Sequence, residues 1–397
     1  MKYRLQELCE KITDGSHYSP KGEEIGYPMF SVKDMLEYGF DYSNCKKISQ
    51  LDYQKMVASG CVPQKGDVLV AKDGSYLKQI FVCEETREEA ILSSIAIFRP
   101  NTDFIESDYL CYLLRSPKVY NYITTNCVSG SALPRIVLKT FKDIELEVPS
   151  LDEQKKVVSI LKSLDEKIKL NHKINKNLEE QALALFKSYF IDYDNFNGQA
   201  PYTWKKGVLG DFVEIKRGGS PRPIQNYLSD CGLHWLKISD ATCITSPFIN
   251  EIKEYIIEDG LKKTVFLKAG ALVLSNSATP GLPKILDIDT CIHDGWLYFP
   301  TSRLSNEYLY LFFKHIREKL VALGNGSVFT NLKTDILKNY PSFLPTQEIL
   351  CEFDGIVKPL FEMILATTRE IKNLITLRDT LLPKLMSGEL DVSELDI

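Results

Sequence analysis

Three charged residues in the second half of the chain are of the types that a metal-dependent nuclease needs. Such nucleases hold Mg²⁺ between an Asp and a Glu and place a Lys nearby to orient water. Asp240, followed by Glu251 and Lys253, fits that spacing loosely, and Glu214 with Lys216 offers a second pair. Patterns this short arise by chance, and an exposed, charged, amphipathic segment explains Glu251 and Lys253 more simply. A stand-alone nuclease is therefore the alternative hypothesis.

Other catalytic signatures are missing from the sequence. It has no phosphate-binding GxxxxGK[ST] loop, no GxGxxG turn, and no [DNS]-P-P-[YF] tetrapeptide of the kind that amino-methyltransferases use. The histidines have no HExxH spacing, no serine lies in a GxSxG elbow, and the cysteines are scattered without a CxxC pair. We therefore expect a chain with no catalytic residues, metal or cofactor of its own.

The longest periodic stretch runs from Asp152 to about Ile191 and contains neither Gly nor Pro. Its apolar residues return at alternating steps of four and three, which is typical of a coiled-coil seam. Asp152, just after Pro149, is expected to cap this helix. At about 1.5 Å per residue, a helix of 30 to 40 residues spans roughly 45 to 60 Å. The predicted pairing residues on this seam are Val157, Leu161, Leu164, Ile168, Leu178 and Leu185.

A second stretch repeats this register 196 positions later (353 − 157), and it provides the partner that the apolar stripe needs. Because a Pro inside a helix costs roughly 3 kcal/mol, Pro359 predicts a short helix ending near Val357. A long helix is then expected from Pro359 to about Ser387, with Gly388 as its stop and a loose tail after it. The predicted pairing residues of this second seam are Ile364, Ile371, Leu374 and Leu381.

Two positions of the first seam, Asn171 and Asn175, are polar. Buried amides in a coiled coil can set the register of the two helices. It is equally open that both side chains lie at a solvated edge. Arg378 of the second helix is a candidate partner for them.

The remaining sequence is an internal repeat. Gly66 to Ala71 (GDVLVA) matches Gly270 to Ser275 (GALVLS), 204 positions later (270 − 66). The loops between the matching segments differ, as in residues 16–28 against 220–233. A shared frame with different loops indicates two modules of one fold that bind different things.

Composition bounds the function further. The chain has 397 residues, a net charge of −5 and 44% hydrophobic residues, with no apolar run as long as a membrane span. The amphipathic N-terminus lacks an apolar signal core, so we expect a cytoplasmic protein without membrane contact. Because the net charge is negative, any DNA binding has to come from local faces.

Several segments resemble the specificity subunit of a type I restriction-modification system, over essentially the whole length. The most specific are VPSLDEQKKVVSILKSLDEKI at 148–168, LFKSYFIDYDNF at 185–196, PYTWKKGVLGDFVEIKRGGSP at 201–221 and LRDTLLPKLMSGEL at 377–390. The entry to the second helix is a weaker copy, because Thr346-Gln347 replaces a Glu-Gln pair. The resemblance implies an α+β, pseudo-two-fold chain in which two mixed α/β target-recognition domains are separated by two long antiparallel helices that form a coiled coil.

The same resemblance implies the division of labour. The expected domains are 1–148 and 195–345 for target recognition, with the helical regions at 149–194 and at 346–397. Each domain would read half of a split, asymmetric double-stranded DNA site, and the helices would set the spacer. Methylation and cleavage, with S-adenosylmethionine, ATP and Mg, would belong to two methyltransferase subunits and to restriction/translocase subunits.

Two sets of residues follow as candidates for contacts. Phe186, Tyr189 and Phe190 are expected to pack on the chain's own domains, with docking of a methyltransferase subunit as the alternative. DNA-facing candidates are polar or basic groups at the loop ends of the repeated strands. They are Lys33, Lys72, Ser75, Lys78 and Arg135 in the first module, and Arg217, Arg222, Lys237, Asn276, Ser277, Lys284 and Asn331 in the second.

Overall fold

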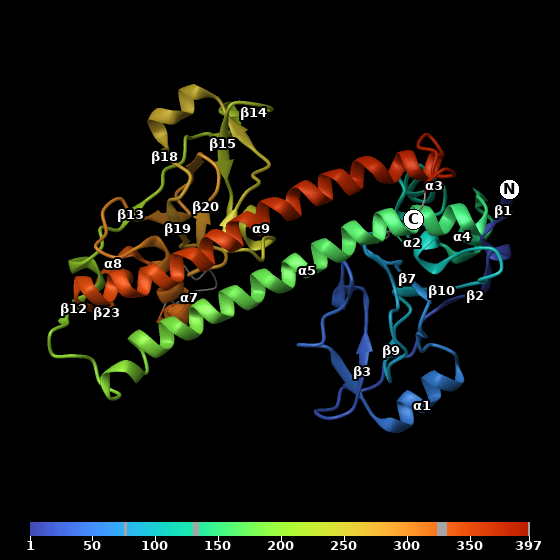
Figure 1. Cartoon of the computed structure of the whole chain (residues 1–397), viewed down its shortest axis with the longest axis horizontal. Helices are drawn as coiled ribbons and strands as arrows, with labels where there is room; N and C mark the ends of the chain where they lie inside the picture. Colours follow the sequence, from blue (N-terminus) through green and yellow to red (C-terminus); the bar gives the residue numbers. More distant parts are fainter. Residues whose placement is uncertain (75–77, 130–134, 324–331, 396–397) are drawn as a thin grey trace. The chain divides into compact units, whose positions relative to one another are not determined.

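The computed structural model describes residues 1–74, 78–129, 135–323 and 332–395. By internal contacts the chain forms two compact units, and each contains a section of both long helices (Figure 1). Unit 1 consists of Met1–Lys167 with Ile375–Ile397, and unit 2 of Ile168–Leu374. Among the described residues, no helix is both long and apolar enough to cross a membrane.

Unit 1 is built on an antiparallel four-stranded sheet in the order β2-β10-β7-β8. Its central strand β7 is buried on both faces, which explains why its sequence VLVA is a continuous apolar run rather than an alternating one. A three-stranded sheet (β6-β3-β9) and the pairs β1-β11 and β4-β5 complete the unit. The strands are β1 (Lys2–Arg4), β2 (Cys9–Asp14), β3 (Tyr27–Phe30), β4 (Met35–Leu36), β5 (Gly39–Phe40), β6 (Lys46–Ile48), β7 (Val68–Ala71), β8 (Ile80–Val82), β9 (Ala90–Ile91), β10 (Ile95–Pro100) and β11 (Glu145–Glu147).

The short helices of unit 1 begin where the sequence provides a start signal. Ser49 caps α1 by accepting a hydrogen bond from the Asp52 N–H at 3.2 Å. The chain is interrupted at Ser116, where α2 ends and α3 starts with Pro117 in its first turn. These helices are α1 (Gln50–Ala58), α2 (Ser107–Arg115), α3 (Pro117–Asn126) and α4 (Leu138–Lys142).

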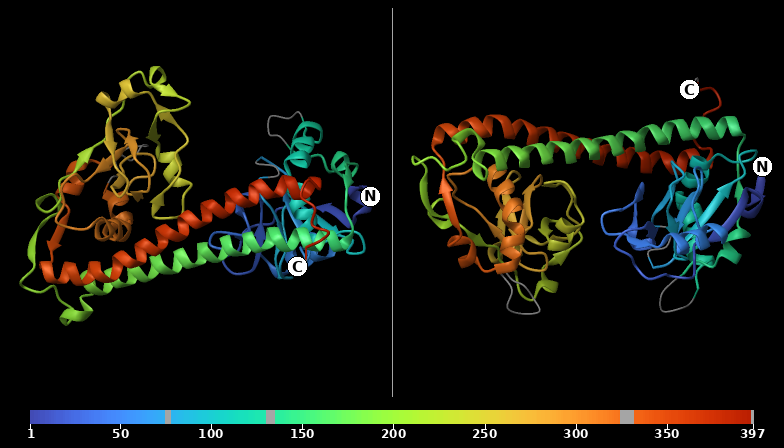
Figure 2. Two further views of the ribbon diagram at one scale, coloured as in Figure 1. Left: turned by 45° about the horizontal axis from the view of Figure 1, so that its top comes forward. Right: turned by 90° about the horizontal axis from the view of Figure 1, so that it is seen from below.

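Unit 2 repeats this plan with two five-stranded sheets, ordered β13-β22-β19-β20-β16 and β14-β17-β15-β21-β18, and the pair β12-β23. Its strands are β12 (Lys205–Val208), β13 (Lys216–Arg217), β14 (Leu228–Ser229), β15 (Leu233–Leu236), β16 (Phe248–Ile249), β17 (Tyr255–Ile256), β18 (Val265–Leu267), β19 (Leu272–Ser275), β20 (Pro283–Leu286), β21 (Thr290–Ile292), β22 (Trp296–Tyr298) and β23 (Pro341–Leu344). Its helices are α6 (Ile238–Thr242), α7 (Asn306–Leu323) and α8 (Thr334–Lys338). In each unit the sheets lie on one side of the two long helices (Figure 2).

The first long helix, α5 (Leu151–Phe190), starts two residues earlier than a cap at Asp152 would predict, so the expectation that Asp152 caps it is wrong. Its cap is Ser150, whose Oγ accepts from the Glu153 N–H at 3.3 Å, while Glu153 accepts from the Ser150 N–H at 2.9 Å. This reciprocal Ser-x-x-Glu arrangement satisfies two amides at the helix start. The hydrogen bonds from Ser150 also lower the pKa of the Glu153 carboxyl.

The second long helix, α9 (Gln347–Ser387), is continuous, so the predicted break at Pro359 is wrong. Pro359 has no N–H, so the Gly355 carbonyl lacks its helical hydrogen bond. Because both Gly355 and Pro359 are exposed, water can donate to that carbonyl instead. Val357 and Phe361, on the two sides of the proline, are buried. Their burial outweighs the cost of the proline.

The end of α9 and the chain after it are well defined. Gly388, with φ of 74°, ends the helix as predicted. The expectation of a loose tail is wrong for the described residues, because Val392 is buried in the core of unit 1. Lys156 of α5 donates a hydrogen bond to the Ser393 carbonyl at 2.7 Å, which ties the tail to the helix start.

The two long helices run antiparallel in both units. In unit 1, Asp165 of α5 contacts Arg378 of α9 at 2.9 Å. In unit 2, Asn175 donates to the Thr368 hydroxyl at 3.2 Å. From the first of these contacts to the second, the residue number rises on α5 and falls on α9, as it does between antiparallel helices. Of the predicted pairing residues, Val157, Leu161, Ile168, Leu178, Ile364 and Ile371 are buried, and Leu164, Leu185, Leu374 and Leu381 are half-buried.

The polar seam positions are buried rather than solvated. Asn171 donates to Glu370 at 2.8 Å, and Asn175 is held by Thr368 and by the Thr367 hydroxyl. Arg378 is not their partner, because the antiparallel register places it opposite Asp165.

The aromatic residues at the end of α5 pack within unit 2, as predicted. Phe186, Tyr189 and Phe190 are all buried in its main core. Phe190 lies 4.8 Å from both Tyr308 and Phe353, measured between ring centroids. These contacts join the end of α5 to both α7 and α9.

Candidate functional site

Three segments meet beyond the C-terminal end of β7, the central strand of unit 1. The Lys72 N–H donates to the Ser94 carbonyl at 2.9 Å, and the Lys72 carbonyl accepts from the Ile136 N–H at 3.0 Å. Asp73 and Arg135 face each other in an isolated antiparallel bridge. This geometry brings together two predicted DNA-facing residues, Lys72 and Arg135. We call Asp14, His17, Lys72, Asp73 and Arg135 the strand-end site of unit 1.

The two basic residues of this site have different surroundings. Lys72 is buried and its ammonium lies 2.7 Å from Asp14 Oδ2, so its charge is already neutralised. Arg135 Nε lies 2.9 Å from Asp73 Oδ1, but 58% of the Arg135 side chain remains exposed. His17 Nε2 lies 3.7 Å from the same Asp14 oxygen. Arg135 is thus the cation that this site presents to solvent.

Unit 2 has the same backbone arrangement beyond β19. The Asn276 N–H donates to the Gly295 carbonyl at 2.8 Å, and the Asn276 carbonyl accepts from the Leu332 N–H at 2.7 Å. Asn276 therefore occupies the position that Lys72 has in unit 1. The correspondence extends to the residues that follow β2 in unit 1 and β13 in unit 2. Gly15 donates to the Ile95 carbonyl and Gly218 to the Trp296 carbonyl.

This correspondence makes Arg217, which precedes Gly218, the counterpart of Asp14, which precedes Gly15. The buried Lys72–Asp14 ion pair of unit 1 is therefore replaced by an Asn and an Arg in unit 2. The backbone frame is shared, while the charges at its end are different.

Asp294 is the centre of the unit 2 site. Its Oδ1 accepts from the Ser220 hydroxyl at 2.7 Å, and its Oδ2 accepts from Arg222 Nη2 at 3.2 Å. Arg217 donates through Nε to the Asp294 carbonyl. Partial burial opposes ionisation of Asp294, but the Ser220 hydrogen bond and the nearby cations hold the pKa of its carboxyl below the usual value. We call Arg217, Ser220, Arg222, Asn276, His293 and Asp294 the strand-end site of unit 2.

Asn276 and His293 form the buried floor of this site. Asn276 exposes 5% of its surface, donates to the Asp294 carbonyl at 3.2 Å, and has a buried Oδ1 without a hydrogen-bond partner among the residues that the structure describes. His293 Nδ1 accepts from the Gly295 N–H at 2.8 Å. Burial lowers the pKa of His293, which favours the neutral ring. The site therefore offers hydrogen-bond donors and acceptors.

The other predicted residues of unit 2 lie in different surroundings. Ser277 is half-buried near Gly295, and Lys237 is paired with Glu254. Lys284 is buried and donates to the carbonyls of Ile244 and Ser246 at 2.6 and 2.5 Å. Burial lowers its pKa to about 8.

The remaining candidates do not join either cluster. Lys33 and Lys78 are exposed in unit 1. Ser75 and Asn331 lie outside the described residues.

Three carboxylates that organise these sites were not among the residues predicted from the sequence: Asp14, Asp73 and Asp294. The one available signal for Asp294 is the Asp294-Gly295 dipeptide, which marks a turn after a strand. A Cβ at Gly295 would lie 2.2 Å from His293 Cε1, so a larger residue there would displace the His293 ring.

The nuclease alternative finds no support. Asp240 Oδ2 accepts from the Lys237 N–H at 3.1 Å at the start of α6, whereas Glu251 and Lys253 are exposed. Across residues 1–74, 78–129, 135–323 and 332–395, no group of three or more His, Cys, Asp or Glu side chains could hold a metal ion.

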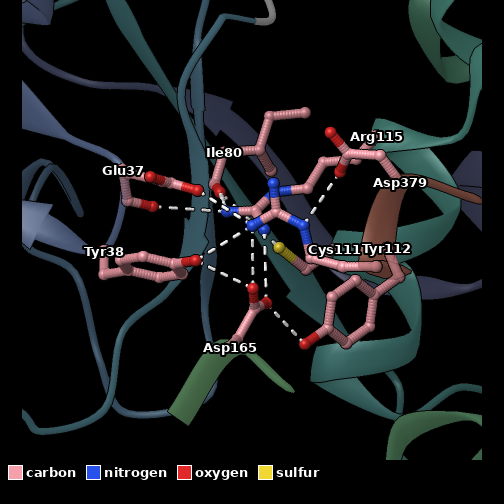
Figure 3. A network of polar contacts seen from close by, with 9 residues as sticks. Glu37, Tyr38, Ile80, Cys111, Tyr112, Arg115, Asp165 and Asp379 are labelled. Atoms are coloured by element: carbon pink, nitrogen blue, oxygen red, sulfur yellow. Dashed lines mark hydrogen bonds and ion pairs between the residues drawn. The ribbon is translucent and has the colours of Figure 1, made fainter. Parts of the chain in front are cut away.

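A second polar network anchors the first sheet domain to the helices within unit 1 (Figure 3). Asp165 of α5 is buried and accepts from the Tyr38 and Tyr112 hydroxyls at 2.8 and 2.7 Å. Arg378 of α9 binds the same carboxylate at 2.9 Å, and Arg115 Nη1 lies 3.7 Å from it. Burial beside this carboxylate raises the pKa of both tyrosines.

Comparison with known proteins places these sites in context. A family model described as the type I restriction modification DNA specificity domain matches residues 1–180 and 201–377. The type I restriction enzyme MjaIX specificity subunit of Methanocaldococcus jannaschii is 29% identical over 313 residues, which is 74% of this chain and 71% of that protein. The HindI specificity subunit of Haemophilus influenzae is 24% identical over 466 residues, covering 98% and 99% of the two chains.

The architecture is also known from a solved structure. The crystal structure of a type I restriction-modification S subunit from M. genitalium matches with a TM-score of 0.58, covers 97% of this chain and 95% of that chain, and is 14% identical. The predicted α+β architecture of two mixed domains and two long antiparallel helices is confirmed.

Proposed function

Because the chain belongs to the family of type I restriction modification DNA specificity domains, we propose that it reads a bipartite, asymmetric sequence in double-stranded DNA. Residues 1–148 would read one half-site and residues 195–345 the other. Family membership makes the chain a specificity subunit, whose relatives carry that name. The division into two half-sites is our inference from the two strand-end sites.

The proposal is carried by one observation: the two units share a backbone frame, but the side chains at the end of its central strand carry different charges. The same backbone hydrogen bonds place Lys72 in unit 1 and Asn276 in unit 2 at the end of the central strand. One position therefore carries a neutralised ammonium and the other an amide. Around this frame the exposed donors also differ, because unit 1 presents Arg135 and unit 2 presents Arg217 and Arg222. Since the number and placement of exposed donors determine which base edges a surface can match, two such modules would select two different half-sites.

The long helices have the properties of a spacer. α5 contains 40 residues and α9 contains 41, and a helix of this size is about 60 Å long. Buried polar pairs, such as Asn175 with Thr368, fix one register between them. We propose that the helix pair sets the distance between the half-sites and docks two methyltransferase subunits.

Methylation and cleavage are assigned to partner subunits. The strand-end sites supply donors and acceptors, and their acidic side chains are engaged with cations, as Asp14 is with Lys72. S-adenosylmethionine, ATP and Mg would accordingly act in the methyltransferase and restriction/translocase subunits. The net charge of −5 predicts weak DNA binding by the isolated chain.

Exchange of one domain tests the proposal. Residues 1–148 are replaced by the corresponding domain of another specificity subunit, and the assembled methyltransferase complex is expressed in cells. Sequencing of the methylated sites should show one half-site changed, with the other half-site and the spacer retained. A motif altered in both halves would contradict the assignment of one half-site to each domain.

A further inference from the structure

Both strand-end sites present an exposed arginine that a carboxylate holds in place. In unit 1, Arg135 Nε lies 2.9 Å from Asp73 Oδ1. In unit 2, Arg222 Nη2 lies 3.2 Å from Asp294 Oδ2, and Arg217 donates to the Asp294 carbonyl. The side chains of these arginines are 58%, 79% and 56% exposed, respectively.

The supporting carboxylates are themselves restrained. Asp294 is fixed by Ser220, whose hydroxyl donates to Oδ1 and accepts from the Asp294 N–H. Asp73 lies in a backbone bridge with Arg135 itself, and its side chain is 23% exposed. Each arginine is therefore held at an aspartate whose position the fold determines: Arg135 and Arg222 at the carboxylate, and Arg217 at the Asp294 backbone carbonyl. A restrained guanidinium loses less conformational entropy on binding than a free one.

The carboxylates also indicate what the arginines bind. A phosphate contact needs net positive charge, and a carboxylate within 4 Å of the guanidinium would repel the phosphate. A base edge is uncharged, so the carboxylate does not oppose it. A guanidinium has five N–H donors. Arg135 and Arg217 are held through Nε, so their two Nη groups can serve another partner. Arg222 is held through Nη2 and retains Nη1 and Nε as donors for a base.

Guanine is the base whose edge matches that donor set. It presents two acceptors, O6 and N7, in the major groove, and an arginine binds both at once. Adenine presents a donor beside its acceptor, so it cannot accept a fork of two N–H groups.

We propose that Arg135 in unit 1, and Arg217 with Arg222 in unit 2, each held at an aspartate, read guanine in the two half-sites. Asp73 and Asp294 are positioning residues in this scheme. The inference rests on the proposed function, because it presumes that each domain reads a half-site.

The test is methylation specificity of the assembled methyltransferase complex on a plasmid library with randomised half-sites. The variants are Arg135→Lys, Arg217→Lys and Arg222→Lys, which keep the charge and lose the fork. The matched control is Arg87→Lys. Arg87 is also exposed and held by a carboxylate, with its Nη2 3.1 Å from Glu85, but it lies near Cys83, which pairs with the opposite end of β7.

Arg135→Lys should reduce discrimination at a G·C pair in one half-site by roughly 5- to 150-fold, the loss expected for one bidentate base contact. At least one of the two unit 2 variants should do the same in the other half-site only. Asp294→Asn should weaken discrimination at that same G·C pair. Arg87→Lys should change neither half-site.

Several results would overturn the inference. They are unchanged discrimination in the lysine variants, a uniform loss over all sequences as a phosphate contact would give, relaxation at an A·T pair, or the same change in Arg87→Lys. If a lysine variant does not assemble, the Arg→Gln variant replaces it. A wild-type complex that methylates no bipartite motif would instead refute the proposed function.

Discussion

Asp165 is the residue whose replacement tests the anchoring of the first sheet domain most directly. In Asp165→Asn the side chain keeps its shape, but the buried negative charge that faces Arg378 and Arg115 is lost (Figure 3). The Arg378 side chain is 13% exposed, so its charge would remain largely buried without its main partner.

The magnitude follows from the surroundings. Removing one partner of a buried ion pair costs about 3 to 5 kcal/mol. Arg378 keeps two exposed partners, Glu37 at 2.9 Å and Asp379 at 3.0 Å, and each such pair is worth up to about 1 kcal/mol. We therefore expect Asp165→Asn to lower the free energy of unfolding of unit 1 by roughly 2 to 4 kcal/mol. The control Asp379→Asn should cost less than about 1 kcal/mol.

The assay uses the distribution of tryptophans. Trp204, Trp235 and Trp296 are all of the tryptophans in the chain, and all belong to unit 2. Urea unfolding followed by tryptophan fluorescence therefore reports unit 2, and circular dichroism reports the whole chain. Asp165→Asn should shift the circular dichroism transition more than the fluorescence transition. Equal destabilisation by Asp165→Asn and Asp379→Asn would refute the reasoning.

Three further outcomes are expected. Burial lowers the pKa of Lys284 to about 8, so the buried ammonium destabilises unit 2 fully below that pH and no longer does so above about pH 10.5, the usual pKa of a lysine in the unfolded chain. The free energy of unfolding of the wild type relative to Lys284→Met, measured with urea, should therefore rise between these pH values, and a constant difference would contradict this. Asn171→Ala removes the hydrogen bond that Asn171 donates to Glu370 and should lower the stability of unit 2 by about 1 kcal/mol, whereas exposed Asn177→Ala should change it by less than about 0.5 kcal/mol in fluorescence-detected unfolding. An insertion of seven residues into α5 within 168–182, matched by seven in the facing part of α9, lengthens the helix pair by about 10 Å. The spacer in the methylated motif should then grow by roughly 3 base pairs, at about 3.4 Å each, and an unchanged spacer in an active variant would contradict the proposed role of the helices.

The long helices illustrate which features follow from sequence. Their apolar period is local information, because it depends only on spacing along one chain segment. The predicted break at Pro359 was wrong for a reason that is not local. Burial of Val357 and Phe361 holds the helix together, and only packing reveals that burial.

The candidate sites show the same division. The repeat and the ends of its strands indicated Lys72, Arg135, Arg217, Arg222 and Asn276 only as separate candidates. Folding brings Lys72 and Arg135 together in unit 1, and Arg217, Arg222 and Asn276 together around Asp294 in unit 2. Residue type alone could not distinguish an exposed cation from a neutralised one.

Burial decides that distinction in both units. Lys72 is buried against Asp14, and Lys284 against two carbonyls. Asp294 comes from a turn about 70 residues after Arg217 and Arg222, measured along the sequence, so no local pattern joins it to them.

The sequence by itself determined the repeated frame, the two long helices and the family, because periodicity and repeated segments are written along the chain. Tertiary structure alone decided which charges remain available to a partner. A charge is neutralised by whatever side chain folding brings within about 4 Å of it. At the ends of the two central strands, folding buries Lys72 against Asp14 and leaves Arg135, Arg217 and Arg222 exposed beside carboxylates.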